Sequence, residues 1–139
     1  MTRALIHYAA LPIRMVEGIP QVLLITSRET RRWILPKGRP KAKMPARNVA
    51  AQEAYEEAGV AGHVSVKPIG EFPSIKRLRS GQVVPIRVRV YLLDVKTELE
   101  EWPEKTERER HWVPAREAPL VISEPGLADF LAHFASLWV

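Results

Sequence analysis

Three glutamates lie close together in one short segment, at a spacing that would place them on one face of a helix. Glu53, Glu56 and Glu57 are three and four residues apart, and at roughly 100° per residue they share an arc of about 100°. Like charges at this spacing disfavour a helix unless a cation lies between them. Carboxylate oxygens are ligands that Mg²⁺ prefers, often while it also binds substrate phosphates. The spacing therefore makes these residues candidate metal ligands, although an acidic helix face is also typical of a solvated surface.

A basic, glycine-containing segment leads directly into these acids. Residues 28–47 contain eight lysines or arginines and one acid, and residues 76–89 contain five and none. Cations for phosphate oxygens beside carboxylates for a metal are what phosphoanhydride chemistry requires. The candidate phosphate contacts are Arg28, Arg32, Lys37, Lys76, Arg77, Arg87 and Arg89. Taken singly, each is also explained as a solvated surface cation. The net charge of +5 fits an anionic partner.

The elements that must position these residues follow from hydrophobic periodicity and from glycine and proline. We expect a helix over residues 45–58, which proline begins and Gly59 ends. On its apolar side, Tyr55 is predicted to pack on a sheet. A loop is expected over 37–44, extended chain over 4–11, 21–27, 33–35, 64–73, 83–95 and 111–113, and a second helix over 123–138. This order predicts an α/β domain with a mixed sheet and helices on its faces.

Length and composition set the outer limits. The 139 residues are 46% hydrophobic, which predicts a single domain over 1–139 with a packed core. No cysteine is present, which excludes disulfides, thiolate metal sites and thiol nucleophiles. The four histidines are scattered and are interpreted as structural. No apolar run is long enough to cross a bilayer, so we predict a cytoplasmic protein without a membrane partner.

Residues 38–60 resemble the Nudix box, G-x5-E-x7-R-E-U-x-E-E-x-G-U. Counted onto this chain, the pattern falls on Gly38, Met44, Gln52, Glu53, Ala54, Glu56, Glu57, Gly59 and Val60. Seven of these nine positions agree, while Met44 stands where the box has glutamate and Gln52 where it has arginine. Residues 32–38, Trp102 and residues 108–113 are similar to the flanks in the diphosphoinositol polyphosphate phosphohydrolase branch. That branch and its bacterial relatives also cleave diadenosine polyphosphates.

The resemblance implies a Nudix α/β/α sandwich and hydrolysis that depends on Mg²⁺, with Mn²⁺ as a substitute. It implies that Glu53, Glu57 and the backbone carbonyl of Gly38 bind the metal and that Glu56 is the general base. In the family this last role moves between box glutamates and a later acid. The candidates for such an additional acid here are Glu98, Glu100 and Glu101.

Together these observations predict hydrolysis of a phosphoanhydride bond in a highly phosphorylated small molecule, of the diadenosine or diphosphoinositol polyphosphate type. Met44 and Gln52 support an alternative, a Nudix-fold module that binds a nucleotide without turning it over. A third hypothesis is removal of the 5′ pyrophosphate from RNA. The basic residues are not interleaved with aromatic residues and no RNA-binding motif is present, so nucleic acid is not the predicted partner. The oligomeric state is left open.

Overall fold

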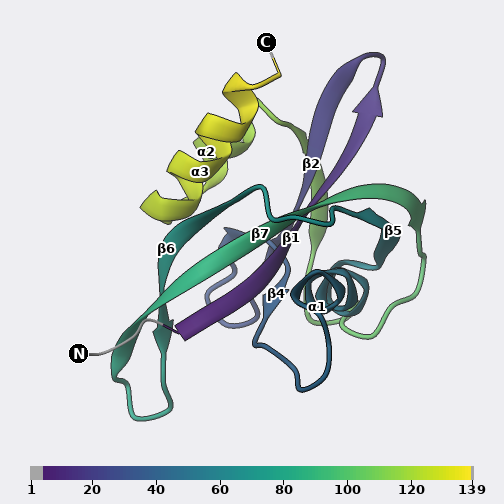
Figure 1. The fold of residues 1–139 in the computed structure, drawn as a ribbon. Helices are drawn as coiled ribbons and strands as arrows, with labels where there is room; N and C mark the ends of the chain where they lie inside the picture. The colour runs from purple at the N-terminus through teal and green to yellow at the C-terminus, as the bar shows by residue number, and fades with distance from the viewer. Residues whose placement is uncertain (1–4, 139) are drawn as a thin grey trace.

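The computed structural model describes residues 5–138 (Figure 1). The start of the predicted first strand at residue 4 and the two ends of the predicted domain lie outside this range. The elements in chain order are β1 (Leu5–Val16), β2 (Ile19–Thr26), β3 (Trp33–Ile34), β4 (Lys37–Gly38), α1 (Ala46–Glu53), the π-helical η1 (Ala54–Ala58), β5 (Val60–Val64), β6 (Gly70–Arg77), β7 (Val83–Glu98), β8 (Arg110–Pro114), α2 (Ala118–Val121) and α3 (Pro125–Ser136).

The strands form one mixed sheet organised around β7. Strand β1 pairs with β7 in parallel, and both β5 and β6 pair with β7 antiparallel. Strands β1 and β2 form a hairpin, whose turn residues Glu17 and Gly18 have φ of 51° and 79°. Positive φ at both central residues is the geometry that a two-residue hairpin turn requires. Strands β3 and β8 then pair with β2. The predicted mixed sheet is therefore confirmed.

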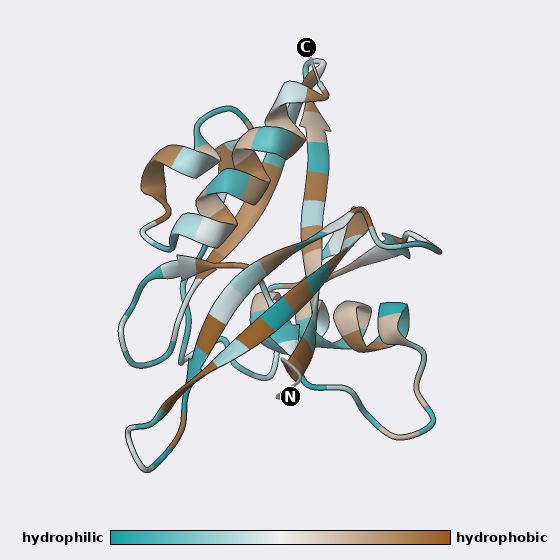
Figure 2. Ribbon diagram, turned by 60° about the vertical axis from the view of Figure 1, so that its left-hand side comes forward, coloured by the Kyte–Doolittle hydropathy of each residue, from teal (hydrophilic) through white to brown (hydrophobic). Residues whose placement is uncertain are grey.

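Each face of the sheet is covered by a helix, as the alternation along β7 predicts. Figure 2 shows hydrophobic and hydrophilic residues alternating along the strands. On one face Val88 and Val90 pack with Leu127 and Leu131 of α3. On the other face Leu93 packs with the alanines of α1 and η1, which are Ala50, Ala54 and Ala58. The two helical layers lie on opposite sides of the sheet in Figure 1, so the expected α/β/α sandwich is confirmed. No helix within residues 5–138 is long and apolar enough to cross a membrane.

The predicted helix over residues 45–58 differs from the structure in a way that matters for its acids. Regular α-helix ends at Glu53, and η1 continues it as a wider π-helical turn, a form that recurs at functional sites. The prediction that Tyr55 packs on the sheet is wrong, because Tyr55 is 44% exposed. Glu53 and Glu57 are instead buried, at 8% and 6% exposure. The glutamates therefore turn into the protein and do not form a solvated face.

Two further predictions are corrected by long-range pairing. Lys37 and Gly38, expected in a loop, form β4 because they pair with Ala9 and Tyr8 of β1. The extended segment over residues 64–73 is divided between β5 and β6. The residues between these strands run along β7, where Ser65 N–H and Ile69 N–H donate to its carbonyls.

The C-terminal end of η1 is closed by side chains from the segment after β7. Trp102 Nε1 donates to the Glu57 carbonyl at 3.2 Å, and Arg110 Nη1 donates to the carbonyls of Ala58 and Gly59. The Arg110 guanidinium also lies over the Trp102 ring, 3.9 Å from its centroid. These bonds satisfy carbonyls that a helix end leaves unpaired, and they hold the turn that carries Glu57.

We expect Gly59→Ala to be strongly destabilising. Gly59 has φ of 66°, and an added Cβ would lie 2.6 Å from the Trp102 ring and 2.7 Å from Arg110 Nη1. The control is Gly18→Ala, where φ is also positive but nothing lies within 4 Å of the added Cβ. Urea unfolding should show a loss of about 2–4 kcal/mol for Gly59→Ala and about 1 kcal/mol for Gly18→Ala. Equal losses would contradict the packing argument.

Candidate active site

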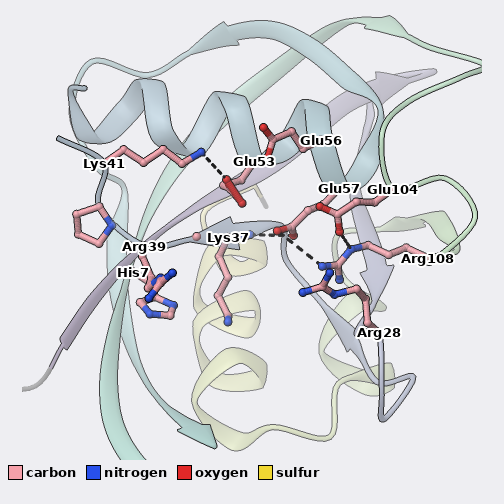
Figure 3. A pocket seen from close by; sticks show the side chains of 12 residues that line it. His7, Arg28, Lys37, Arg39, Lys41, Glu53, Glu56, Glu57, Glu104 and Arg108 are labelled. Atoms are coloured by element: carbon pink, nitrogen blue, oxygen red, sulfur yellow. Dashed lines mark hydrogen bonds and ion pairs between the residues drawn. The ribbon is translucent and has the colours of Figure 1, made fainter. Parts of the chain in front are cut away.

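An open cavity of about 730 Å³ lies between α1, η1 and β4. It is lined by His7, Arg28, Lys37, Gly38, Arg39, Pro40, Lys41, Glu53, Glu56, Glu57, Glu104 and Arg108 (Figure 3). The cavity thus brings together the three predicted glutamates, Gly38, Lys37 and Arg28. It adds residues that the sequence argument did not single out, and it places acidic and basic side chains in one enclosure.

The buried carboxylates lie against β4 because Gly38 has no side chain. A Cβ at Gly38 would lie 2.5 Å from Glu53 Cδ, so any larger residue would displace this carboxylate. The backbone N–H of Lys37 donates to Glu57 Oε1 at 3.3 Å. Strand β4 therefore supplies both the space for one acid and a hydrogen-bond donor for the other.

Burial is the main reason why the Glu57 carboxyl has an abnormal pKa. Burial raises its pKa to about 8, the positive charge of Arg108 opposes the rise, and neighbouring Glu53 adds to it. Arg108 Nη2 is 3.8 Å from Glu57 Oε2, while its Nε donates to Glu104 Oε1 at 2.9 Å. One guanidinium thus serves two carboxylates and compensates Glu57 incompletely. A cation bound at this carboxylate would supply the missing positive charge.

Glu56, the candidate base, is held by the residue that departs from the box. Gln52 Nε2 donates to Glu56 Oε1 at 3.0 Å, and the Glu56 carbonyl accepts a hydrogen bond from the Glu104 N–H at 3.0 Å. Gln52 Oε1 is buried and has no hydrogen-bond partner within residues 5–138. The Gln52 amide therefore orients Glu56 through an uncharged donor, whereas an arginine would donate from a charged guanidinium.

The acidic end of the cavity fits a divalent cation in donor type and in charge. Glu53, Glu57 and the Gly38 backbone lie together, and Glu57 lacks full compensation. Hard cations prefer such oxygen ligands. In the described part of the chain, however, no three acidic, histidine or cysteine side chains converge closely enough to form a ready-made metal site. Lys41 Nζ donates a hydrogen bond to Glu53 Oε2 at 3.1 Å, which Figure 3 marks with a dashed line.

The predicted phosphate contacts divide into those near the cavity and those away from it. Arg28 lines the cavity and also a neighbouring hollow of about 540 Å³, which Arg32 and Arg77 line as well. Lys37 lines the cavity, and Figure 3 shows its side chain pointing away from the carboxylates. Burial lowers the Lys37 pKa, against the raising effect of Glu57 and Glu124. Lys76 does not line the cavity, but its charge acts on that of Lys37.

Arg87 and Arg89 are not brought to the cavity. Both donate to Glu71, at 3.0 Å and 2.6 Å, and Glu71 is the cross-strand partner of Arg89 in the β6–β7 ladder. This ion-pair cluster also lowers the pKa of Glu71, through the hydrogen bonds from Arg89 and Arg87. Arg87 and Arg89 share one face of β7 because side chains alternate along a strand, and the acid that pairs with them comes from the neighbouring strand β6.

The three later acids predicted as additional candidates also lie outside the cavity lining. Glu98 is bonded to Arg14 and to Trp112 Nε1, and Glu101 pairs with Lys105. Glu100 is exposed. Glu104, which the sequence did not single out, lines the cavity and pairs with Arg108 four residues later. Glu101 and Lys105 have the same i,i+4 spacing outside the cavity lining, so the spacing alone does not indicate which acid reaches the cavity.

His7 was interpreted as structural, and the structure places it in the wall of the cavity. It is 6% exposed, and its Nε2 has no hydrogen-bond partner in the described residues. Burial, followed by the charges of Lys37, Lys76 and Arg39, lowers its pKa to about 4. The imidazole is therefore neutral at pH 7. Nothing in the sequence around His7 indicates these basic neighbours, which come from β4, β6 and the loop after β4.

The fold and the site define a class of domain with a mixed sheet between helices and a cavity at one side of the sheet. In this cavity, carboxylates carried by a helix lie opposite basic side chains. The sequence model of the NUDIX domain family matches residues 7–134 of this chain. The chain therefore belongs to the Nudix hydrolase family, as its box implies.

Curated relatives place the chain within this family. It is 32% identical over 121 residues to Nudix hydrolase 16, mitochondrial, of Arabidopsis thaliana, covering 85% of this chain and 67% of that protein. It is 33% identical over 116 residues to human diphosphoinositol polyphosphate phosphohydrolase 3-alpha, covering 80% and 66%. It spans 50% and 51% of two other Arabidopsis relatives, Nudix hydrolases 12 and 13. The chain thus spans about half to two thirds of the length of these curated relatives.

Structural similarity extends over nearly the whole chain. A Caenorhabditis elegans Ap4A hydrolase binary complex superposes with a TM-score of 0.72 at 15% identity, covering 96% of this chain and 97% of that one. The NUDIX domain of Shewanella oneidensis NrtR, complexed with ADP ribose, superposes with a TM-score of 0.71 at 12% identity, covering 99% and 90%. At these identities the likeness shows the fold alone, and it confirms the expected Nudix sandwich.

The depressed pKa of His7 predicts a pH dependence of stability. Its folded-state value of about 4 lies below the ordinary 6.5, so the unfolded chain binds more protons between these values. The stability contribution is present above pH 6.5 and is lost as the pH falls towards 4. Over this range the free energy of unfolding should fall by about 2–3 kcal/mol more in the wild type than in His7→Gln. Urea unfolding at several pH values measures this difference.

The matched control is His63→Gln, at an exposed position in β5. It should follow the wild type across the range. If His7→Gln also followed the wild type, the interpretation of His7 as a buried neutral imidazole would be wrong.

Proposed function

We propose that this chain hydrolyses a phosphoanhydride bond in a highly phosphorylated small molecule, with Mg²⁺ as the cofactor and Mn²⁺ as a substitute. The observation that carries the proposal is the cavity itself. Buried Glu53 and Glu57 lie at one side of it, and basic residues that include Arg28 and Lys37 line the rest. Bringing a polyphosphate to a nucleophile requires this combination, because phosphate charge must be neutralised while a water is activated.

The side chains divide the chemistry between them. Glu53, Glu57 and the Gly38 carbonyl would hold the divalent ion, which supplies Lewis-acid polarisation of phosphate oxygens and acidifies water. Glu56 orients the attacking water and accepts its proton, and the Gln52 amide sets the direction of the Glu56 carboxylate. Arg28 and Lys37 neutralise charge on the substrate. Because Arg108 is bonded to Glu104, it holds the acidic side of the cavity in place.

The arrangement of cations supports a substrate with several phosphates. Arg28 belongs to two adjoining hollows, so a chain of phosphates that enters the cavity would meet Arg32 and Arg77 in the second hollow. Diadenosine polyphosphates and diphosphoinositol polyphosphates have this character. The names of a human relative and of a C. elegans structural neighbour point to the same two classes.

One observation favours a second candidate function, a Nudix module that binds a nucleotide without hydrolysing it. Gln52 has replaced the box arginine and leaves its Oε1 buried without a partner among the described residues. Met44 offers no carboxylate. Metal-dependent binding without turnover would establish this alternative.

A cytoplasmic location is part of the proposal. The absence of cysteine supports it, since the protein needs no oxidising compartment. Several plant relatives carry the word mitochondrial in their names. Cell fractionation with an antibody to the chain distinguishes the two locations.

The proposal predicts Mg²⁺-dependent phosphate or nucleotide release from at least one member of a substrate panel. The panel contains diadenosine tetra-, penta- and hexaphosphate, a diphosphoinositol phosphate, nucleoside triphosphates and 5′-triphosphorylated RNA. Glu56→Gln and Glu57→Gln should each lower kcat by about two orders of magnitude or more, because each removes a carboxylate from the reacting region.

Glu100→Gln is the matched control, because it makes the same chemical change at an exposed position outside the cavity lining. Its kcat should equal that of the wild type. Absence of turnover across the panel, with metal-dependent binding retained, would replace the enzyme by the binding module. Turnover of RNA alone would change the substrate class to nucleic acid.

A further inference from the structure

Lys41 makes an ion pair inside the cavity with a residue that we assign to the metal. Its Nζ lies 3.1 Å from Glu53 Oε2, and both side chains line the cavity (Figure 3). The Lys41 side chain is 36% exposed and the Glu53 side chain 11%. One end of this pair is therefore fixed in the protein, while the other lies on a flexible stem at the edge of solvent.

Glu53 is the acidic residue that pairs with Lys41. Residues 37–47 contain no aspartate or glutamate, so the loop from β4 to α1 offers Lys41 no acid of its own. Glu53 cannot retreat towards β4, because its carboxylate already lies against Gly38. An ammonium is a compact charge that hydrates readily, so Lys41 can leave Glu53 for water, whereas the buried carboxylate keeps its place.

A carboxylate oxygen that accepts a bond from an ammonium is less available to a divalent cation. Binding of the cation at Glu53 Oε2 must break the bond to Lys41 or share that oxygen with a second positive charge. Both cost free energy that an unpaired carboxylate would not require.

We propose that Lys41 is an internal competitor for the metal site, whose ammonium occupies Glu53 in the free protein and must be displaced when a divalent cation binds. This inference rests on the proposed use of a metal at Glu53. On this view, the loop between β4 and α1 controls the metal affinity of the site, because Lys41 in this loop lowers that affinity. When no metal is bound, the Lys41 ammonium partly neutralises Glu53, which lowers the free-energy cost of burying this carboxylate.

The test is a titration of the whole, substrate-free protein with Mn²⁺, in which electron paramagnetic resonance measures the free ion. Lys41→Gln should bind Mn²⁺ about threefold to tenfold more tightly than the wild type, as expected for loss of a partly buried ion pair. Lys41→Arg keeps the charge, and a guanidinium leaves a carboxylate less readily than an ammonium does, so this variant should bind Mn²⁺ no more tightly than the wild type. The readout does not depend on turnover.

Lys43→Gln is the matched control for net charge. Lys43 lies in the same loop and is exposed, and it makes no ion pair within the described residues. It should change Mn²⁺ affinity by less than about twofold, because a solvated charge at the surface acts weakly. If Lys41→Gln changed the affinity no more than Lys43→Gln, or weakened it, the inference would be overturned.

Thermal melting gives a second, independent measurement. In EDTA, Lys41→Gln should melt at a lower temperature than the wild type, because Glu53 loses its partner. Saturating Mn²⁺ should then raise the melting temperature of Lys41→Gln by more than it raises that of the wild type. Equal shifts would contradict the competition. Absence of Mn²⁺ binding in every variant would instead contradict the metal use in the proposed function, and the inference with it.

Discussion

The burial of two carboxylates against a two-residue strand is the constraint on which the rest of this structure depends. Glu53 and Glu57 lie under the rim of the cavity, where water cannot fully solvate them, and burial raises the pKa of Glu57 to about 8. Gly38 leaves room for one carboxylate and the Lys37 N–H binds the other. The π-helical turn η1 carries Glu57, whose carbonyl accepts a hydrogen bond from Trp102 Nε1.

The basic residues that line the cavity are the electrostatic counterpart of these acids, and they are also partly desolvated. Burial lowers the pKa of Lys37 and of His7, and for His7 the nearby cations lower it further. Cations that repel one another at the edge of a cavity are stabilised by an anion that lies between them. The basic residues that repel one another in this cavity are thus the residues that the proposed polyphosphate substrate would contact. This is the usual relation between stability and function at a binding site.

The two departures from the Nudix box acquire a physical meaning in this setting. Gln52 keeps a hydrogen bond to Glu56 without a charge, and its other amide atom remains unsatisfied. With Met44 in place of a glutamate, the loop before α1 carries no acid, and Lys41 turns to Glu53. The site therefore has fewer charges of both signs than the box pattern implies. A hydrolase with altered metal affinity and a nucleotide-binding module are both consistent with this loss, and they differ in turnover.

The sequence by itself determined the family, the layers and the residues of the acidic helix, because these depend on local periodicity and on fixed spacing. The spacing of the box placed Glu53, Glu56 and Glu57 on one helix, and the glycine after residue 58 predicted the end of that helix. Long-range pairing decided the rest. Pairing with β1 made Lys37 and Gly38 a strand, and the π-helical turn directed Glu57 inward. Arg87 and Arg89 form ion pairs with Glu71 on the neighbouring strand and therefore lie outside the cavity. His7 and Glu104 entered the cavity because segments nearly a hundred residues apart meet there, which only the tertiary structure decides.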